Sequence, residues 1–244
     1  MKMKDQLPEV FPEPEIERIT FKRIGASILA VLNLERGILY TLWALLISPG
    51  ESMRTYLFVN RERFLEPVKL LILTVAVFLF FTLNYIPDSG FIAGFKMGYD
   101  GASSSSSASP EAEQAGEAMI GFIQKYMNVI LLLSVPIAAM VSHWFFRSFR
   151  LKYTEHVVLN AFMYGFLSVV AIILVPVSIV SPSTSNSLLF LLGWLYSIYF
   201  FKDFFRITWG RSIWKSTLIY IVAQVLYTII LAVVVVGFVL IKLK

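Results

Sequence analysis

Polar side chains recur at helical spacing inside otherwise apolar segments of this chain. Positions three and four apart share one face of a helix, so each set forms a stripe. The first stripe consists of Tyr153, His156, Asn160 and Tyr164. The second consists of Ser216, Tyr220, Gln224 and Tyr227. The third consists of Tyr196, Tyr199 and Asp203.

Polar groups that face lipid would cost several kcal/mol each, so we expect the three stripes to face one another. They would form a polar cluster in the cytoplasmic half of a helical bundle, to which His143, Glu155, Glu66 and Lys69 could contribute. Two interpretations remain open. The cluster either hydrogen-bonds the helices together, at about 0.6 kcal/mol per bond, or binds a headgroup or solute from the cytoplasm. Replacing Asn160 with leucine would abolish ligand binding in the second case and only lower thermal stability in the first.

A metal site is a third and weaker interpretation, which would make the protein an intramembrane metalloenzyme. His143, Glu155, His156 and Asp203 are residue types that bind metals. However, Glu155 and His156 are consecutive and would point about 100° apart on a helix. Neither an H-E-x-x-H nor a G-x-S-x-G pattern is present. We therefore predict no catalytic residue, no metal ligand and no cofactor.

Basic residues before the first apolar segment could bind lipid. Arg54, Arg61 and Arg63 could each gain about 1 kcal/mol from anionic headgroups, and Arg54 and Arg61, seven residues apart, would share a helical face. The alternative is that these charges only fix the orientation in the membrane.

Five apolar segments must position these residues. They cover approximately residues 68–86, 127–146, 156–180, 188–205 and 217–241. A spanning helix needs about 20 mainly apolar residues. The chain is 57% hydrophobic and 15% charged, with a mean hydropathy of +0.73, unlike soluble domains. The sequence therefore predicts an all-α integral membrane protein with five transmembrane helices.

Lysine and arginine are distributed unequally around these segments: 17 lie on the side of the N-terminus and 4 on the other. Because basic residues are retained in cytoplasmic loops, we predict a bacterial inner-membrane protein with a cytoplasmic N-terminus and an exterior C-terminus. The net charge of +5 then reflects topology, and no nucleic-acid partner is expected. Anionic lipid headgroups are the expected partner, with a homo-oligomer or a second membrane protein also possible.

Three regions follow from this pattern. Residues 1–23 are predicted to form a flexible cytoplasmic tail, residues 24–65 amphipathic interfacial helices, and residues 66–244 the bundle, with a disordered exterior loop at 87–118. Glu35 and Arg36 lie in the middle of the apolar stretch 24–48, where each charge would cost roughly 2.5–3.5 kcal/mol in a membrane. We therefore expect two interfacial helices broken near Gly37 and ended by Pro49 and Gly50, although a sixth span stays open. Residues 181–186 are predicted to be a tight turn.

Two local patterns resemble a known family. The first comprises residues 41–46 (TLWALL), Pro49-Gly50, residues 53–57 (MRTYL), Arg61, Arg63-Phe64 and Pro67. The second comprises residues 153–160 (YTEHVVLN) and Tyr164-Gly165. Both are similar to the bacterial multi-pass membrane family named domain of unknown function 3667. The chain lacks cysteine and so lacks the cysteine-rich segment with which many members begin. The resemblance implies a membrane location and architecture but no activity.

The sequence favours a structural, lipid-associated or scaffold role in the membrane. The alternative is a small-solute or lipid transporter, since Pro136 and Pro176 interrupt two spans and broken helices are typical of transporters. Gly193 and Ser197 form a small-xxx-small pair that would allow close helix approach or self-association.

Overall fold

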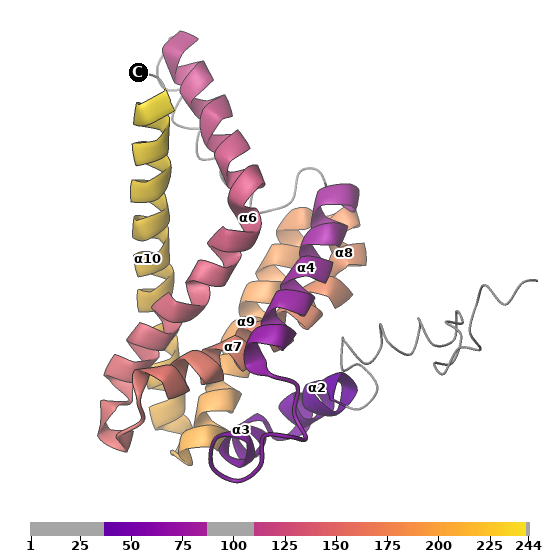
Figure 1. The fold of residues 1–244 in the computed structure, drawn as a ribbon, viewed down its shortest axis with the longest axis vertical. Helices are drawn as coiled ribbons and strands as arrows, with labels where there is room; N and C mark the ends of the chain where they lie inside the picture. Colours follow the sequence, from indigo (N-terminus) through magenta and orange to yellow (C-terminus); the bar gives the residue numbers. More distant parts are fainter. Residues whose placement is uncertain (1–36, 87–109, 243–244) are drawn as a thin grey trace, which may run out of the picture.

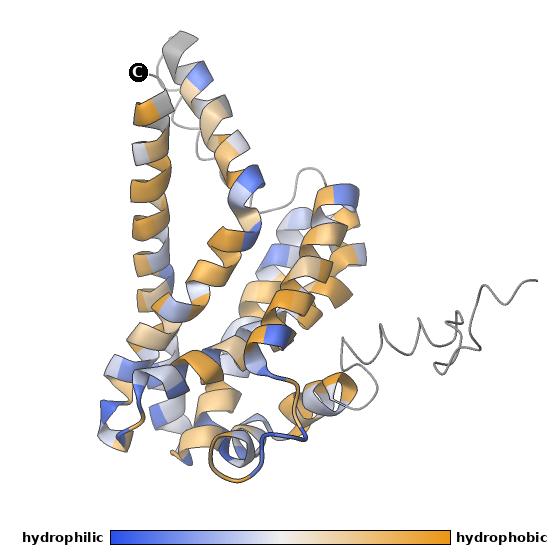
Figure 2. Cartoon of the chain, viewed as in Figure 1, coloured by the Kyte–Doolittle hydropathy of each residue, from blue (hydrophilic) through white to orange (hydrophobic). Residues whose placement is uncertain are grey.

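The computed structural model describes residues 37–86 and 110–242. In this part of the chain all regular structure is helical. Five helices are long and apolar enough to cross a membrane: α4 (Pro67–Tyr85), α6 (Pro110–Phe145), α7 (Tyr153–Ile173), α9 (Pro182–Phe205) and α10 (Trp209–Lys242). Figure 1 shows how these helices are arranged, and Figure 2 shows that hydrophobic residues predominate along them. The prediction of an all-α membrane protein with five spans is therefore confirmed.

Two short helices, α2 (Ile38–Ile47) and α3 (Pro49–Phe58), lie together at one end of the bundle, here named the α3 end (Figure 1). Ser48 separates them with φ −144° and ψ 68°. Pro49 then occupies the first turn of α3, where its missing N–H costs nothing. The Thr41 hydroxyl accepts from the Leu65 N–H at 2.8 Å, which ties the segment before α4 to α2.

The helix α2 ends at Ile47, just before Pro49 and Gly50 as predicted, and these two residues then begin α3. Two other boundaries differ from those predicted. The chain is helical from Pro110 in α6, so the end of the predicted loop 87–118 is wrong, and residues 87–109 lie outside the described residues. Pro182 begins α9, so most of the predicted turn 181–186 is the first turn of a helix, capped by Ser181. The predicted tail and the first interfacial helix also lie outside the described residues.

Proline and local backbone geometry shape the long helices. In α6, Tyr126 is non-helical (φ −111°, ψ 16°), and Pro136 lies further along the same helix. The third span is divided at Leu174 into α7 and α8 (Val175–Val180), with Pro176 in the first turn of α8. The predicted interruption at Pro176 is thus present.

Close packing holds the bundle together. In α7, a Cβ placed on Gly165 would lie 3.1 Å from Leu70 Cγ in α4, so these helices approach closely. At the α3 end, four phenylalanines are fully buried: Phe146, Phe162, Phe200 and Phe201. On α10, by contrast, Ile229 and Val233 remain more than half exposed, as expected of side chains that face lipid.

Candidate functional site

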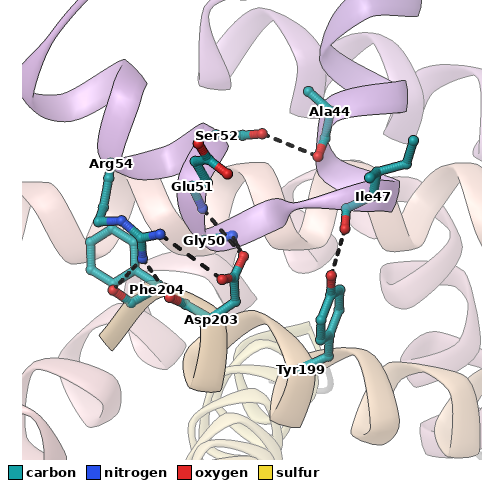
Figure 3. Close-up of polar contacts among 9 residues, drawn as sticks. All are labelled: Ala44, Ile47, Gly50, Glu51, Ser52, Arg54, Tyr199, Asp203 and Phe204. Carbon is teal, nitrogen blue, oxygen red and sulfur yellow. Dashed lines mark hydrogen bonds and ion pairs between the residues drawn. The ribbon is translucent and has the colours of Figure 1, made fainter. Parts of the chain in front are cut away.

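The polar stripe on α9 lies against the corner between α2 and α3 (Figure 3). The Asp203 carboxylate accepts from the backbone N–H of Gly50 at 2.7 Å and from that of Glu51 at 3.3 Å. Both N–H groups belong to the first turn of α3 and have no partner within that helix. Asp203 therefore caps α3 from a distant element, with its negative charge at the positive end of the helix dipole.

Arg54 binds the end of α9 in return. Its guanidinium donates to the backbone carbonyls of Asp203 and of Phe204, the second at 2.9 Å, and it lies 3.9 Å from the Asp203 carboxylate. The last carbonyls of a helix lack partners within it and form its negative end. Arg54 and Asp203 thus satisfy the end groups of each other's helices.

Two tyrosines of α9 bind the carbonyls at the end of α2. The Tyr199 hydroxyl donates to the Ile47 carbonyl at 2.5 Å, and the Tyr196 hydroxyl donates to the Leu45 carbonyl at 3.0 Å (Figure 3). These carbonyls also lie in the last turn of their helix, so the two hydroxyls satisfy groups that α2 cannot.

Gly50 allows the backbones of α3 and α9 to approach closely. A Cβ at this position would lie 2.1 Å from the Phe204 nitrogen and 2.2 Å from the Asp203 carbonyl carbon. No side chain fits there unless the backbones separate. Within the corner, the Ser52 hydroxyl also donates to the Ala44 carbonyl at 3.1 Å. We name Gly50, Arg54, Tyr196, Tyr199 and Asp203 the α3–α9 junction.

This placement corrects the expectation that the three stripes face one another. Tyr196, Tyr199 and Asp203 bind α2 and α3 and do not join the stripe on α7. The physical reason is that the end of α2 and the start of α3 meet at the corner. Their backbone carbonyl and N–H groups lack partners within the helices, and leaving such groups without hydrogen bonds is costly.

The arginines expected to contact anionic lipid are also placed differently. Arg54 belongs to the junction. Arg61 lies beyond the end of α3, so it does not share a helical face with Arg54. Its Nε donates to the Tyr56 carbonyl at 3.3 Å, and its guanidinium lies 5.8 Å from the centre of the Tyr56 ring. Arg63 is exposed and makes neither a hydrogen bond nor an ion pair with any described residue.

The N-terminal part of the α7 stripe binds α6. Ser142 Oγ lies 3.0 Å from His156 Nδ1 and accepts from Asn160 Nδ2 at 3.0 Å, and all three residues are fully buried. The remaining polar atoms, His156 Nε2 and Asn160 Oδ1, are buried without a partner among the described residues. This part of the stripe is therefore an interhelical hydrogen-bonded cluster near the α3 end.

The residues considered as metal ligands do not converge. Glu155 accepts from the Lys152 N–H at 2.7 Å and so caps its own helix, while Asp203 belongs to the junction. His143 packs against His156 with ring centres 5.2 Å apart. Over residues 37–86 and 110–242, no three His, Cys, Asp or Glu side chains are close enough to hold a metal ion. Tyr153, at the start of α7, donates to the Pro136 carbonyl at 3.2 Å.

The C-terminal part of the α7 stripe lines a cavity of about 270 Å³ that is bounded by all five spanning helices. Its polar lining residues are Ser134, Tyr164, Ser168, Asn186, Ser197, Tyr220, Gln224 and Tyr227. The Tyr227 hydroxyl donates to the Ile130 carbonyl at 3.2 Å. The hydroxyls of Tyr164 and Tyr220 and the amide of Gln224 form no hydrogen bond with any described residue. Among the described residues, none that lines the cavity is charged.

The cavity lies deeper in the bundle than the predicted cluster. Tyr164 follows the start of α7 by 11 residues, which corresponds to about 16 Å along a helix. The cavity is therefore near mid-depth and not at the α3 end. Gly193 keeps part of it open, since a Cβ there would lie 3.8 Å from the Tyr220 hydroxyl and 3.7 Å from Leu167.

Sequence reasoning missed the roles of several small residues. Ser142 precedes His143 and is the buried partner of the α7 stripe, and its helical spacing from Ser134 was an available signal. At Gly50 the sequence shows only a proline–glycine pair, which is typical of turns. Nothing in the sequence relates Gly50 to Asp203, because 153 residues separate them.

Comparison with known proteins adds one finding. The model of the family described as "Protein of unknown function (DUF3667)" matches residues 35–79. No curated protein and no solved structure matches the chain significantly. The second pattern, at residues 153–165, lies outside the matched segment. The match confirms the resemblance to the DUF3667 family over α2, α3 and most of α4.

Proposed function

We propose that this membrane protein binds a neutral, mostly apolar ligand in the cavity between its five spans. The observation that carries the proposal is the convergence of Tyr164, Tyr220 and Gln224, with no described hydrogen-bond partner for their side chains, on a cavity whose surface is mainly apolar. Binding sites for small molecules are typically apolar cavities with a few polar groups that fix orientation.

The lining defines the chemistry of the ligand. A net charge would lack a counter-ion among the described lining residues, and an unpaired charge at mid-membrane is costly. Tyrosine hydroxyls and a glutamine amide both donate and accept, so they suit a hydroxyl or carbonyl group. At about 30 Å³ per water, the cavity of about 270 Å³ would accommodate a ligand of roughly nine water volumes, such as a substituted ring or part of a lipid tail.

The test uses 2-naphthol as a neutral probe and naphthalene as the matched compound without a hydroxyl. With the full chain in nanodiscs, we expect saturable binding of 2-naphthol above its partition into lipid. Gly193→Leu would place a side chain in the cavity beside the Tyr220 hydroxyl and should strongly weaken that binding. Gly193→Ala is the control, because its Cβ makes only ordinary contacts, and it should bind within twofold of the native chain.

Tyr220→Phe and Gln224→Leu should weaken 2-naphthol binding but leave naphthalene unaffected, and Tyr85→Phe, on an exposed residue, should change neither. Equal saturable binding by the native chain and Gly193→Leu would overturn the proposal. A pure scaffold role would give an empty cavity and a co-purifying membrane protein.

Transport of the same ligand is the second candidate. Two helices that line the cavity are interrupted, α6 at Tyr126 and the third span at Leu174, and broken helices often accompany alternating access. A carrier should give flux in liposomes that is lost in Tyr220→Phe or Gln224→Leu. A binding protein should retain the ligand without flux.

The location we infer is a bacterial inner membrane, with the α3 end in the cytoplasm. The excess of lysine and arginine, 17 against 4, supports this orientation, because basic loops stay inside. Gln114, at the opposite end of α6, should react from outside the cell as a single cysteine. Arg150→Cys, at the α3 end, should react only after the membrane is opened. The reverse pattern would invert the orientation.

A further inference from the structure

Two arginines have a backbone conformation that normally belongs to glycine. Arg150 has φ 56° and Arg206 has φ 49°, and in the described part of the chain these are the only non-glycine residues with positive φ. Each follows the end of a helix: Arg150 follows the short helix η1 (Arg147–Phe149), and Arg206 follows α9. Glycine is preferred at helix ends in this conformation because a Cβ is disfavoured there.

The residues directly before the two arginines are in contact at the α3 end. Each arginine directly follows a phenylalanine, and the rings of Phe149 and Phe205 have their centres 4.6 Å apart. The rings of Phe146 and Phe205 are both buried and stack with their centres 3.9 Å apart. This stacking holds Phe205 in place against Phe149. The connections α6–α7 and α9–α10 are therefore held side by side, and each carries an exposed arginine next to the aromatic contact.

Nearby acidic groups do not neutralise this pair. Neither guanidinium forms a hydrogen bond or ion pair with a described residue. Glu155 caps its own helix, and Asp203 binds Gly50 and Arg54. The sequence thus keeps two unneutralised cations in a conformation that glycine would adopt more easily. Strained residues of this kind often serve a function.

The surrounding surface indicates the chemistry of the ligand. Trp144, Trp209 and Trp214 belong to the same ends of α6 and α10 and are 64%, 54% and 68% exposed. Exposed tryptophans of spanning helices lie at the level of lipid headgroups. Arginine binds phosphate through a planar fork of donors. We propose that Arg150 and Arg206 together bind the phosphate of an anionic phospholipid, independently of the ligand in the cavity.

The left-handed conformation makes a sharp test possible. Arg150→Gly and Arg206→Gly remove the charge and also relieve the backbone. We therefore expect melting temperatures in lipid-free detergent that are equal to or above that of the native chain. Phosphatidylglycerol binding, measured by native mass spectrometry against phosphatidylcholine, should fall roughly fivefold for each charge and about 25-fold in the double variant.

Three controls separate this site from general attraction. Lys125→Ala removes an exposed cation of α6 far from the α3 end and should reduce the preference for phosphatidylglycerol by less than twofold. Arg206→Lys keeps the charge without the fork and should still weaken binding. Inorganic phosphate should not compete with the lipid at millimolar concentration.

Unchanged phosphatidylglycerol preference in the double glycine variant would overturn the proposal. A lower melting temperature of that variant without lipid would overturn the conformational argument, and equal protection by inorganic phosphate would exclude the lipid as the source.

Discussion

Replacing Gly50 with alanine tests the α3–α9 junction where the two backbones approach closely. The new Cβ would lie 2.1 Å from the Phe204 nitrogen, so α3 must move away from α9. This movement breaks the Asp203 cap, at about 0.5–2 kcal/mol, and the charged hydrogen bonds of Arg54, at roughly 1.5–3 kcal/mol. Alanine regains up to about 1 kcal/mol through helix propensity. We therefore expect docking of α3 to weaken by about 1–4 kcal/mol.

The absence of native cysteine provides the assay. Ser52 is 6% exposed, and its hydroxyl binds the Ala44 carbonyl of α2, so a thiol introduced by Ser52→Cys should react with maleimide mainly when the α2–α3 corner leaves α9 and opens. A change of about 1.4 kcal/mol is tenfold in an equilibrium constant. When reclosing is fast, the labelling rate follows that constant, and Gly50→Ala should raise it from roughly fivefold to several hundredfold.

The matched control is Gly237→Ala in α10, where an added Cβ meets nothing within 4 Å. In the Ser52→Cys background, this control should label within twofold of the parent. Equal labelling rates in the Gly50→Ala and Gly237→Ala chains would refute the reasoning, because the corner would then dock without the close backbone approach.

Three further predictions concern single side chains. Tyr199→Phe leaves the Ile47 carbonyl without its 2.5 Å bond, and it should raise Ser52→Cys labelling by less than tenfold, corresponding to about 1 kcal/mol. Asn160→Leu removes a bond to Ser142, so it should lower stability in detergent by about 0.6 kcal/mol and leave 2-naphthol binding intact. A loss of binding would extend the site to the buried cluster of Ser142, His156 and Asn160. Burial raises the pKa of Tyr56 above 10. The stability it contributes is therefore complete below pH 10 and is lost as pH rises further, so Tyr56→Phe should reduce the fall of the melting temperature above pH 10.

The spans could be predicted from the sequence because length and hydropathy act locally. About 20 apolar residues suffice to specify a spanning helix wherever it packs. Residues 110–118 show where this reasoning fails, since small and acidic residues there indicated a loop, yet α6 begins at Pro110. A proline in the first turn of a helix was the available signal, and the same signal at Pro182 marks the start of α9.

The partners of the polar stripes could not be predicted in the same way. Helical spacing fixes which residues share a face, but it does not say which neighbour that face meets. Tyr164, Tyr220 and Gln224 do line one cavity, whereas Asp203 binds the first turn of α3. Asp203 differs from the cavity residues because the end of α2 and the start of α3 lie beside it, and this position is set by the tertiary structure.

The matched segment 35–79 therefore depends on a distant helix for its own geometry. The N–H groups at the start of α3 and the carbonyls at the end of α2 are satisfied by Asp203, Tyr196 and Tyr199, all outside the match. Backbone groups without partners are costly wherever water is excluded. Expressed without α9, this segment would leave those groups open, so the conformation of the α2–α3 corner is a property of the bundle and not of the segment that the family model describes.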